Sequence, residues 1–123
     1  MKIKQFEYGP LSHYSYAVIS DGEMAVIDPQ RDPKPYYNYA KAHKAKITIV
    51  LETHPHADFV SSHLQIHKET GATIYNSKKI EPNYPYKAFN EGDTIALGHI
   101  KLKAIHTPGH SPDSITIVAV DGD

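Results

Sequence analysis

Two histidines and an aspartate lie within five positions of one another in this chain, at His54, His56 and Asp58. Imidazole nitrogens and carboxylate oxygens are common ligands of divalent metals in proteins. The chain holds 9 histidines, so this cluster alone could arise by chance. A second segment, residues 106–110, adds two imidazoles and ends in Pro-Gly-His. The two segments together predict a metal site built from His54, His56, Asp58 and His110.

Each of these segments follows a stretch that is typical of a β-strand. Residues 47–51 are continuously apolar and rich in β-branched side chains, which indicates a strand buried on both faces. Residues 60–70 then have a helical pattern that ends at Gly71. The first segment therefore follows the carboxyl end of a buried strand, where open sheets usually bind ligands. In the second segment, Gly109 allows a bend that directs His110 toward the metal.

The sequence motifs in these two segments resemble those of the metallo-β-lactamase superfamily. Residues 52–59 read Glu-Thr-His-Pro-His-Ala-Asp-Phe, and residues 107–111 read Thr-Pro-Gly-His-Ser. The first string is most similar to the persulfide dioxygenase branch, and in particular to bacterial proteins that fuse such a domain to rhodanese modules. The resemblance extends from about Phe6 to about Val118 and includes shorter matches at residues 27–32 and 100–103.

The resemblance implies an α+β fold, the four-layered αββα sandwich built from two similar halves. Residues 1–123 would form the N-terminal portion, with a mixed, mostly antiparallel sheet that carries helices on one face. The chain stops inside an expected hairpin at Asp121-Gly122. We therefore expect a longer protein whose second half supplies the next aspartate ligand and a further histidine.

The resemblance also assigns roles to the candidate residues. In persulfide dioxygenases the iron ligands are the first histidine of the motif, the Pro-Gly-His imidazole and a downstream aspartate. These correspond to His54, His110 and a residue beyond the end of this chain. His56 would support the site or, in a zinc protein, bind the metal directly. Asp58 is the catalytic candidate, and it would either lie beside the metal or hold a second one.

Phe59 separates the functions that this site could have. The commoner motif of the superfamily has a histidine at this position, and that histidine would bind a second metal. The phenyl ring of Phe59 therefore favours one metal ion per site. One Fe(II) ion suits the oxidation of a small-molecule thiol persulfide to sulfite with O2. The alternatives are a Zn(II) thioester hydrolase of the glyoxalase II kind and a metal-binding half-domain without activity. Metal content and substrate would separate them.

Two further groups of polar residues have alternative interpretations. Asp28 closes a predicted strand before Pro29, where it could orient a ligand histidine or simply form a turn. His63 and His67 lie four residues apart and would share a helix face. Because no third ligand is near them, we interpret this pair as part of a polar surface.

The remaining elements follow from periodicity and turn residues. Asp21-Gly22 predicts a tight hairpin, and Asp32-Pro33 predicts a helix start. The expected strands are residues 2–8, 15–20, 24–28, 72–76, 94–97, 100–105 and 114–120, with a helix over 33–44 and a surface loop over 77–90.

Composition excludes several classes of protein. The net charge of −1 gives no electrostatic argument for binding nucleic acid or a membrane surface. No apolar run approaches the roughly 18 residues that a membrane-spanning helix needs, and there is no cysteine for disulfides or thiolate ligands. We expect one domain in the cytoplasm, acting on a small-molecule thiol persulfide or thioester.

The predicted strand at residues 47–51 also predicts a partner. It is apolar on both faces, and we expect this chain's helices to cover only one of them. The uncovered face would favour self-association as a homodimer. By resemblance, a rhodanese domain in the full-length protein is a further partner.

Overall fold

The first three strands pair side by side in antiparallel fashion. They are β1 (Lys2–Tyr8), β2 (His13–Ser20) and β3 (Glu23–Ile27). Asp21 and Gly22 have φ values of 51° and 79°, which is the left-handed backbone that a tight hairpin between twisted strands requires. The structure is a computed structural model that describes residues 2–8, 13–52, 63–76, 87–88, 92–106 and 115–121. The predicted strands at 2–8 and 15–20 and the predicted Asp21-Gly22 hairpin are confirmed, with the second strand starting two residues early at His13.

The chain then changes to parallel pairing through two helices. The elements are α1 (Lys34–Ala42), β4 (Lys46–Glu52), α2 (His63–Thr70), β5 (Thr73–Asn76) and the short β6 (Lys87–Ala88). Helix α1 begins at Lys34 with Pro33 as its N-cap, one residue later than predicted, and the Asp32 carboxylate accepts a hydrogen bond from the Lys34 N–H at 3.0 Å. The result is a six-stranded mixed sheet in the order β1-β2-β3-β4-β5-β6.

A second, three-stranded sheet is wholly antiparallel. It consists of β7 (Thr94–Leu97), β8 (Ile100–His106) and β9 (Ile115–Asp121). Leu102 and Ala104 of β8 are buried, whereas Lys101 and Lys103 are exposed, as the alternating pattern predicts. The β7–β8 turn contacts the β2–β3 turn, where the His99 N–H donates to Ser20 Oγ at 3.0 Å.

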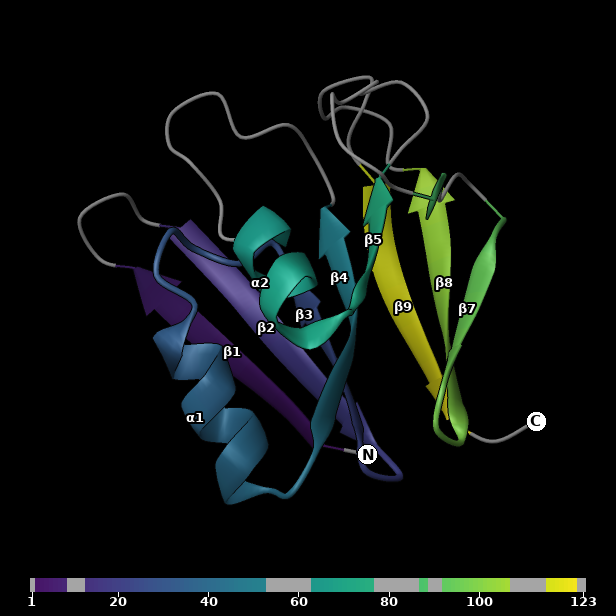
Figure 1. Cartoon of the computed structure of the whole chain (residues 1–123). Helices are drawn as coiled ribbons and strands as arrows, with labels where there is room; N and C mark the ends of the chain where they lie inside the picture. The colour runs from purple at the N-terminus through teal and green to yellow at the C-terminus, as the bar shows by residue number, and fades with distance from the viewer. Residues whose placement is uncertain are drawn as a thin grey trace.

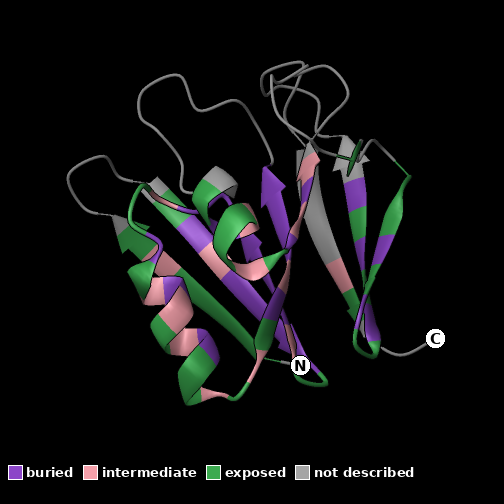
Figure 2. Ribbon diagram, in the orientation of Figure 1, coloured by how far each residue is buried: buried purple, intermediate pink, exposed green. Residues whose placement is uncertain are grey.

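Two apolar cores lie on opposite faces of the larger sheet (Figures 1 and 2). On one face, Val50 and Ile47 of β4 pack with Tyr36 of α1 and Ile66 of α2. On the other face, the two sheets pack together through a cluster of buried residues: Val18, Ala25, Ile27, Ile49, Leu51, Ile95, Leu97, Ile100, Leu102 and Ala104. The predicted α+β architecture with helices on one face of the larger sheet is therefore confirmed.

The second core corrects one expectation about the predicted strand at residues 47–51. Both faces of β4 are buried, as predicted, but the chain's own second sheet covers the face that was expected to stay open. The area argument for a homodimer is therefore wrong, because β4 leaves no large apolar face for a second copy to cover.

Most predicted boundaries are close to the observed ones. The predicted strand at 24–28 ends one residue early, because Asp28 turns to a left-handed φ of 52°. The predicted loop at 77–90 contains the short strand β6, and its other residues lie outside the described ones.

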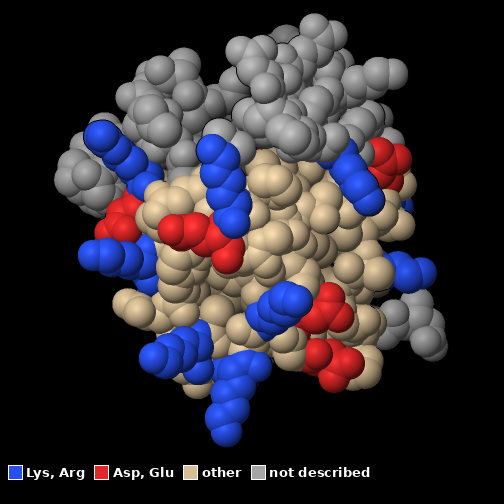
Figure 3. All heavy atoms as spheres, viewed as in Figure 1, with Lys and Arg blue, Asp and Glu red and all other residues tan. Residues whose placement is uncertain are grey.

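Within the described part, no helix is long and apolar enough to cross a membrane. Basic and acidic side chains are interspersed on the face that Figure 3 shows, without a patch of one sign.

Candidate metal centre

The four predicted ligand residues are His54, His56, Asp58 and His110, and all of them lie outside the residues that the structure describes. Phe59 lies outside them as well. The convergence of these side chains on one metal therefore stays a prediction. The structure does describe the strands and helix that border both segments, and these can be compared with what a shared site requires.

The bordering strands end on the same side of the molecule. The first segment leaves β4 after Glu52, and the second leaves β8 after His106. In Figure 1 the carboxyl ends of β4, β5 and β8 all point toward the upper end of the molecule. Since the two sheets also pack against each other, both segments start at one end of the same sandwich. This placement is what a site shared by His54 and His110 requires.

Two carboxyl groups are buried at this end of the larger sheet. Asp28 follows β3 and is 6% exposed, and Glu52 is the last residue of β4 and is 3% exposed. Their strands are parallel neighbours, and the Asp28 N–H donates to the Leu51 carbonyl at 2.8 Å. Buried carboxyl groups require polar or charged partners, so this end of the sheet must contain polar groups that pair with Asp28 and Glu52.

The Tyr36 hydroxyl connects this end of the sheet to helix α1. It forms a 2.7 Å hydrogen bond with Ser15 Oγ and accepts another from the Gln30 N–H, also at 2.7 Å. Burial is the main cause that raises the pKa of Tyr36, and the Glu52 and Asp28 carboxylates raise it further, while the two hydrogen bonds oppose the shift. The phenol therefore stays neutral and fixes the backbone that follows Asp28.

The backbone of Asp28 supports one of the two interpretations made from the sequence. A φ of 52° is uncommon for a residue other than glycine, although aspartate tolerates it better than most. The backbone therefore turns at Asp28, as the turn interpretation predicts. Whether Asp28 also orients a ligand histidine stays a prediction.

Sequence reasoning did not find the roles of Glu52, Ser15 and Tyr36. The available signal was Glu52 itself, a charged residue that directly follows the apolar run of a buried strand and precedes the histidine motif. Ser15 and Tyr36 gave no such signal, because their contact joins positions 21 residues apart.

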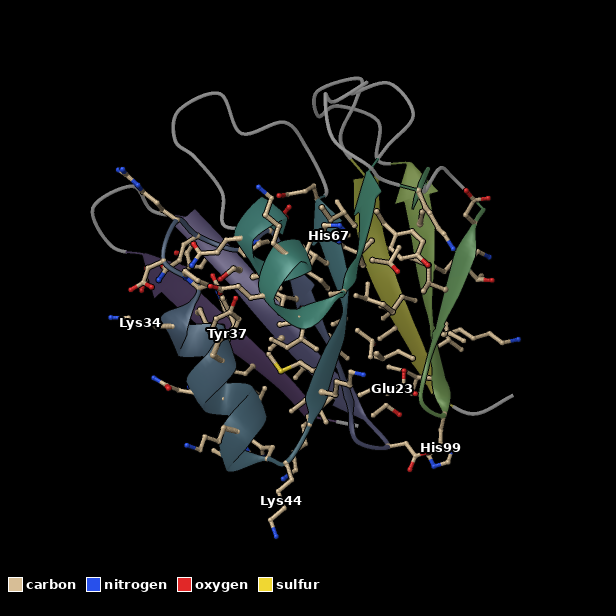
Figure 4. The ribbon with its side chains drawn as sticks, viewed as in Figure 1. Glu23, Lys34, Tyr37, Lys44, His67 and His99 are labelled. Carbon is tan, nitrogen blue, oxygen red and sulfur yellow. The ribbon has the colours of Figure 1, made fainter. Side chains whose placement is uncertain are left out.

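Among the other histidines, His67 has a structural partner. Its Nδ1 lies 2.7 Å from the Ala72 carbonyl oxygen, which it reaches as a donor from the end of α2 (Figure 4). Across the described stretches of the chain, no group of three or more potential ligand residues comes together. The assignment of a divalent metal to the imidazole and carboxylate donors of the two segments stays a prediction.

Comparisons with known proteins agree with this arrangement. A family model described as the metallo-beta-lactamase superfamily matches residues 8–123. The cytoplasmic hydroxyacylglutathione hydrolase of Arabidopsis thaliana is 34% identical over 108 residues, which cover 85% of this chain and 42% of that enzyme. The chain thus spans less than half the length of this relative.

Two solved structures share the fold. A metallo-beta-lactamase from Staphylococcus aureus superposes with a TM-score of 0.85 at 38% identity, covering 98% of this chain and 39% of that one. ETHE1 from Myxococcus xanthus superposes with a TM-score of 0.88 at 24% identity, covering 97% of this chain and 54% of that one. The second likeness shows the fold alone.

Proposed function

Because the chain belongs to the metallo-β-lactamase superfamily, we propose that it forms part of an enzyme that oxidises a small-molecule thiol persulfide to sulfite with O2 at a single iron ion. The observation that carries this proposal is Phe59, which stands where the commoner motif has the histidine that serves a second metal. A phenyl ring cannot bind a metal, so the motif favours a mononuclear site. Oxidation of sulfur by O2 needs one redox-active ion, whereas hydrolysis is helped by two.

Each candidate residue has a role in this proposal. His54 and His110 would hold the iron together with a carboxylate from beyond residue 123, and His56 and Asp58 would support them. Bound Fe(II) would supply the redox chemistry with O2 and a position for the substrate sulfur. The imidazoles must be neutral to bind, so metal affinity should fall below about pH 6.

The described strands contribute by fixing where the ligand segments begin. Glu52 ends a strand that is buried on both faces, and the backbone beside it is held by the Asp28-to-Leu51 hydrogen bond. A rigid start limits the directions that His54 and His56 can take, which a metal site requires.

A zinc thioester hydrolase is the second candidate. The 34% identity to a hydroxyacylglutathione hydrolase favours it, since that name specifies a thioester substrate. The third candidate is a metal-binding portion without activity of its own, because the chain spans only part of its relatives. A cytoplasmic location and a rhodanese domain elsewhere in a longer protein belong to the same proposal, and the Arabidopsis relative is named as cytoplasmic.

Metal analysis joined to two activity assays tests the proposal. The purified full-length protein should contain about one iron ion per chain, and its O2 uptake should follow addition of glutathione persulfide. Phe59→His should admit a second metal ion. Zinc with cleavage of a glutathione thioester would instead support the hydrolase, and two metal ions in the unmutated full-length protein would contradict the mononuclear site.

Matched histidine variants locate the site. Loss of a group that merely orients a ligand typically weakens metal affinity about 10- to 100-fold, so His54→Ala and His110→Ala should each lose at least that much. His99→Ala is the control, because His99 lies on the β7–β8 turn, at the other end of the molecule from the carboxyl ends of β4 and β8 (Figure 4). Equal metal content in His54→Ala and the unmutated chain would refute the assignment.

A further inference from the structure

Strand β1 forms one edge of the six-stranded sheet, and no described strand pairs with its outer side (Figure 1). It pairs with β2 along its whole length, Lys2–Tyr8, without a break in register. The strand contains neither proline nor a bulge, which are two of the devices that stop edge strands from pairing with other chains. Its backbone therefore presents a straight row of hydrogen-bonding groups to a partner.

The side chains of β1 between Lys2 and Glu7 are exposed, with one exception. Phe6 is half-buried, because its ring packs on Tyr36 of α1 with 5.0 Å between the centroids. Side chains of a strand alternate between the two faces, so Ile3 lies on the face opposite to α1. Ile3 is 57% exposed, more than any other large hydrophobic side chain in the described residues. A strand added beside β1 would cover part of this side chain.

The register of the sheet determines which backbone groups of β1 point outward. Ser20 and Glu23 flank a two-residue hairpin turn, where the flanking residues bond to each other, so the backbone of Ser20 faces β3. The direction alternates along a strand, so the backbone of Ile19 faces β1, where its partner is Lys2. The same alternation along β1 directs the N–H and C=O groups of residues 3, 5 and 7 toward the free edge.

A second copy of β1 fits this edge in one register better than in the others. Outward-facing residues must pair with outward-facing residues, so an antiparallel pair about a two-fold axis is centred on Lys4, Gln5 or Phe6 if most of the strand is to take part. Centring on Lys4 places two ammonium groups opposite each other, which is destabilising. Centring on Phe6 pairs only residues 4–8. Centring on Gln5 pairs the whole strand and places no like charges opposite each other.

The side chains that meet in the Gln5-centred register are compatible. Lysine on an edge strand often prevents pairing, but here Lys4 lies opposite Phe6 of the second copy. The Lys4 Nζ is already 5.9 Å from the centroid of the Phe6 ring in its own chain, and an ammonium group is attracted to an aromatic face. On the other face, Ile3 lies opposite Glu7, whose methylene groups can cover it. Both contacts occur twice because of the symmetry.

We propose that two copies of the protein pair through β1, in antiparallel orientation about a two-fold axis at Gln5, and so join their larger sheets into one. This surface is distinct from the face of β4 that the chain's own second sheet covers. The partner is a second copy because the strand is complementary to itself in this register. The pairing involves no metal ligand and no substrate, so it goes beyond the proposed function.

Cysteine crosslinking of the full-length protein tests the register. Gln5→Cys places the new thiol opposite its own copy, with the Cα atoms about 5.5 Å apart, which a disulfide spans. Ile3→Cys is the matched control on the same face, because its two copies would be about 13 Å apart along the strands. Ile3→Cys mixed with Glu7→Cys should crosslink, whereas each alone should not. Residues 1–123 contain no cysteine, so peptide mass spectrometry can locate each bond. We expect Gln5→Cys to crosslink about tenfold faster than Ile3→Cys.

A backbone variant tests the hydrogen bonds at the two-fold axis. The Gln5 N–H faces the free edge, so Gln5→Pro removes a donor that the pairing of β1 with β2 does not use. In the dimer it removes one bond from each copy, and the dissociation constant should rise about tenfold or more. Gln5→Thr is the control, because threonine keeps the N–H and suits a strand, and it should change the constant less than about threefold. Sedimentation at up to about 100 μM protein measures both, since small interfaces are weak.

Three results would overturn the proposal. The first is a protein that sediments as a monomer at every concentration tested. The second is equal crosslinking rates for Gln5→Cys and Ile3→Cys, which would indicate random collision. The third is a dimer with the same dissociation constant in Gln5→Pro and the unmutated protein, which would indicate another surface. Because the crosslinking result does not depend on the Gln5→Pro variant, the test remains decisive if that variant folds poorly.

Discussion

Replacing Tyr36 with phenylalanine removes one oxygen atom from the contact that holds helix α1 to the end of the larger sheet. The side chain is fully buried, and its ring packs edge-on against Phe6 with 5.0 Å between centroids. Phenylalanine keeps this ring contact. The hydroxyl, however, bonds to Ser15 Oγ and accepts from the Gln30 N–H, each at 2.7 Å, and both contacts disappear.

The cost follows from what these partners lose. Ser15 is 1% exposed, so its hydroxyl would stay buried without its Tyr36 partner, which typically costs about 1–3 kcal/mol. The Gln30 N–H is only partly buried, and water can replace its partner at a lower cost. We expect the free energy of unfolding to fall by about 2 kcal/mol, a large share of the usual 5–15 kcal/mol. The midpoint of thermal unfolding should fall by about 8 °C.

Urea denaturation of matched variants measures this cost. Tyr39→Phe is the control, because Tyr39 is on the same helix, packs edge-on against Phe6, and its hydroxyl has no hydrogen-bond partner among the described residues. It should change the free energy of unfolding by less than about 0.5 kcal/mol. Ser15→Ala in the Tyr36→Phe background should cost less than in the unmutated chain, because the two residues share a bond. If Tyr36→Phe and Tyr39→Phe had equal stability, the hydrogen-bond reasoning would be wrong.

Two other predictions concern packing and pH. Gly98→Ala should cost about 3 kcal/mol or more in urea denaturation, because φ is 57° and a new Cβ would lie 2.2 Å from the Ser20 carbonyl oxygen. Gly71→Ala has a φ of 78° but meets nothing within 4 Å, so it should cost only about 1–2 kcal/mol, and equal costs would refute the contact. Burial and the hydrogen-bonded Glu69 carboxylate raise the pKa of Tyr37, so this bond stabilises the fold below pH 10 and is lost as the pH rises through the folded-state pKa. The stability advantage of the unmutated chain over Tyr37→Phe should therefore be constant up to about pH 9 and shrink in stronger base, and an advantage that grew there would contradict the sign.

Local patterns in the sequence were sufficient to predict most elements of the fold. The alternation along β8 places Leu102 inside and Lys101 outside, because side chains of a strand point to opposite faces in turn. The Asp21-Gly22 hairpin follows from residues that tolerate a positive φ. Such features are determined by residues that are adjacent in the sequence, so a single sequence is enough to predict them.

Contacts between distant positions could not be predicted in this way. The Ser15–Tyr36 bond joins a strand to a helix 21 residues later, and nothing in either neighbourhood specifies it. The same limit explains the wrong expectation for β4. Its two apolar faces correctly predicted cover on both sides, but the pattern could not tell whether Leu51 would meet this chain's own second sheet or another molecule.

The core between the two sheets is also what makes a shared metal site physically reasonable. The segment with His54 follows the parallel part of the fold, whereas the segment with His110 follows an antiparallel hairpin in the other sheet. Among the described strands no backbone ladder joins the two sheets, so the distance between the sheets is set there by side chains such as Leu51 and Leu102, both fully buried. Close-packed side chains resist changes in spacing. A metal that binds residues from both segments would therefore stabilise the packing of the sheets, and the packing would in turn hold the ligands at a fixed separation.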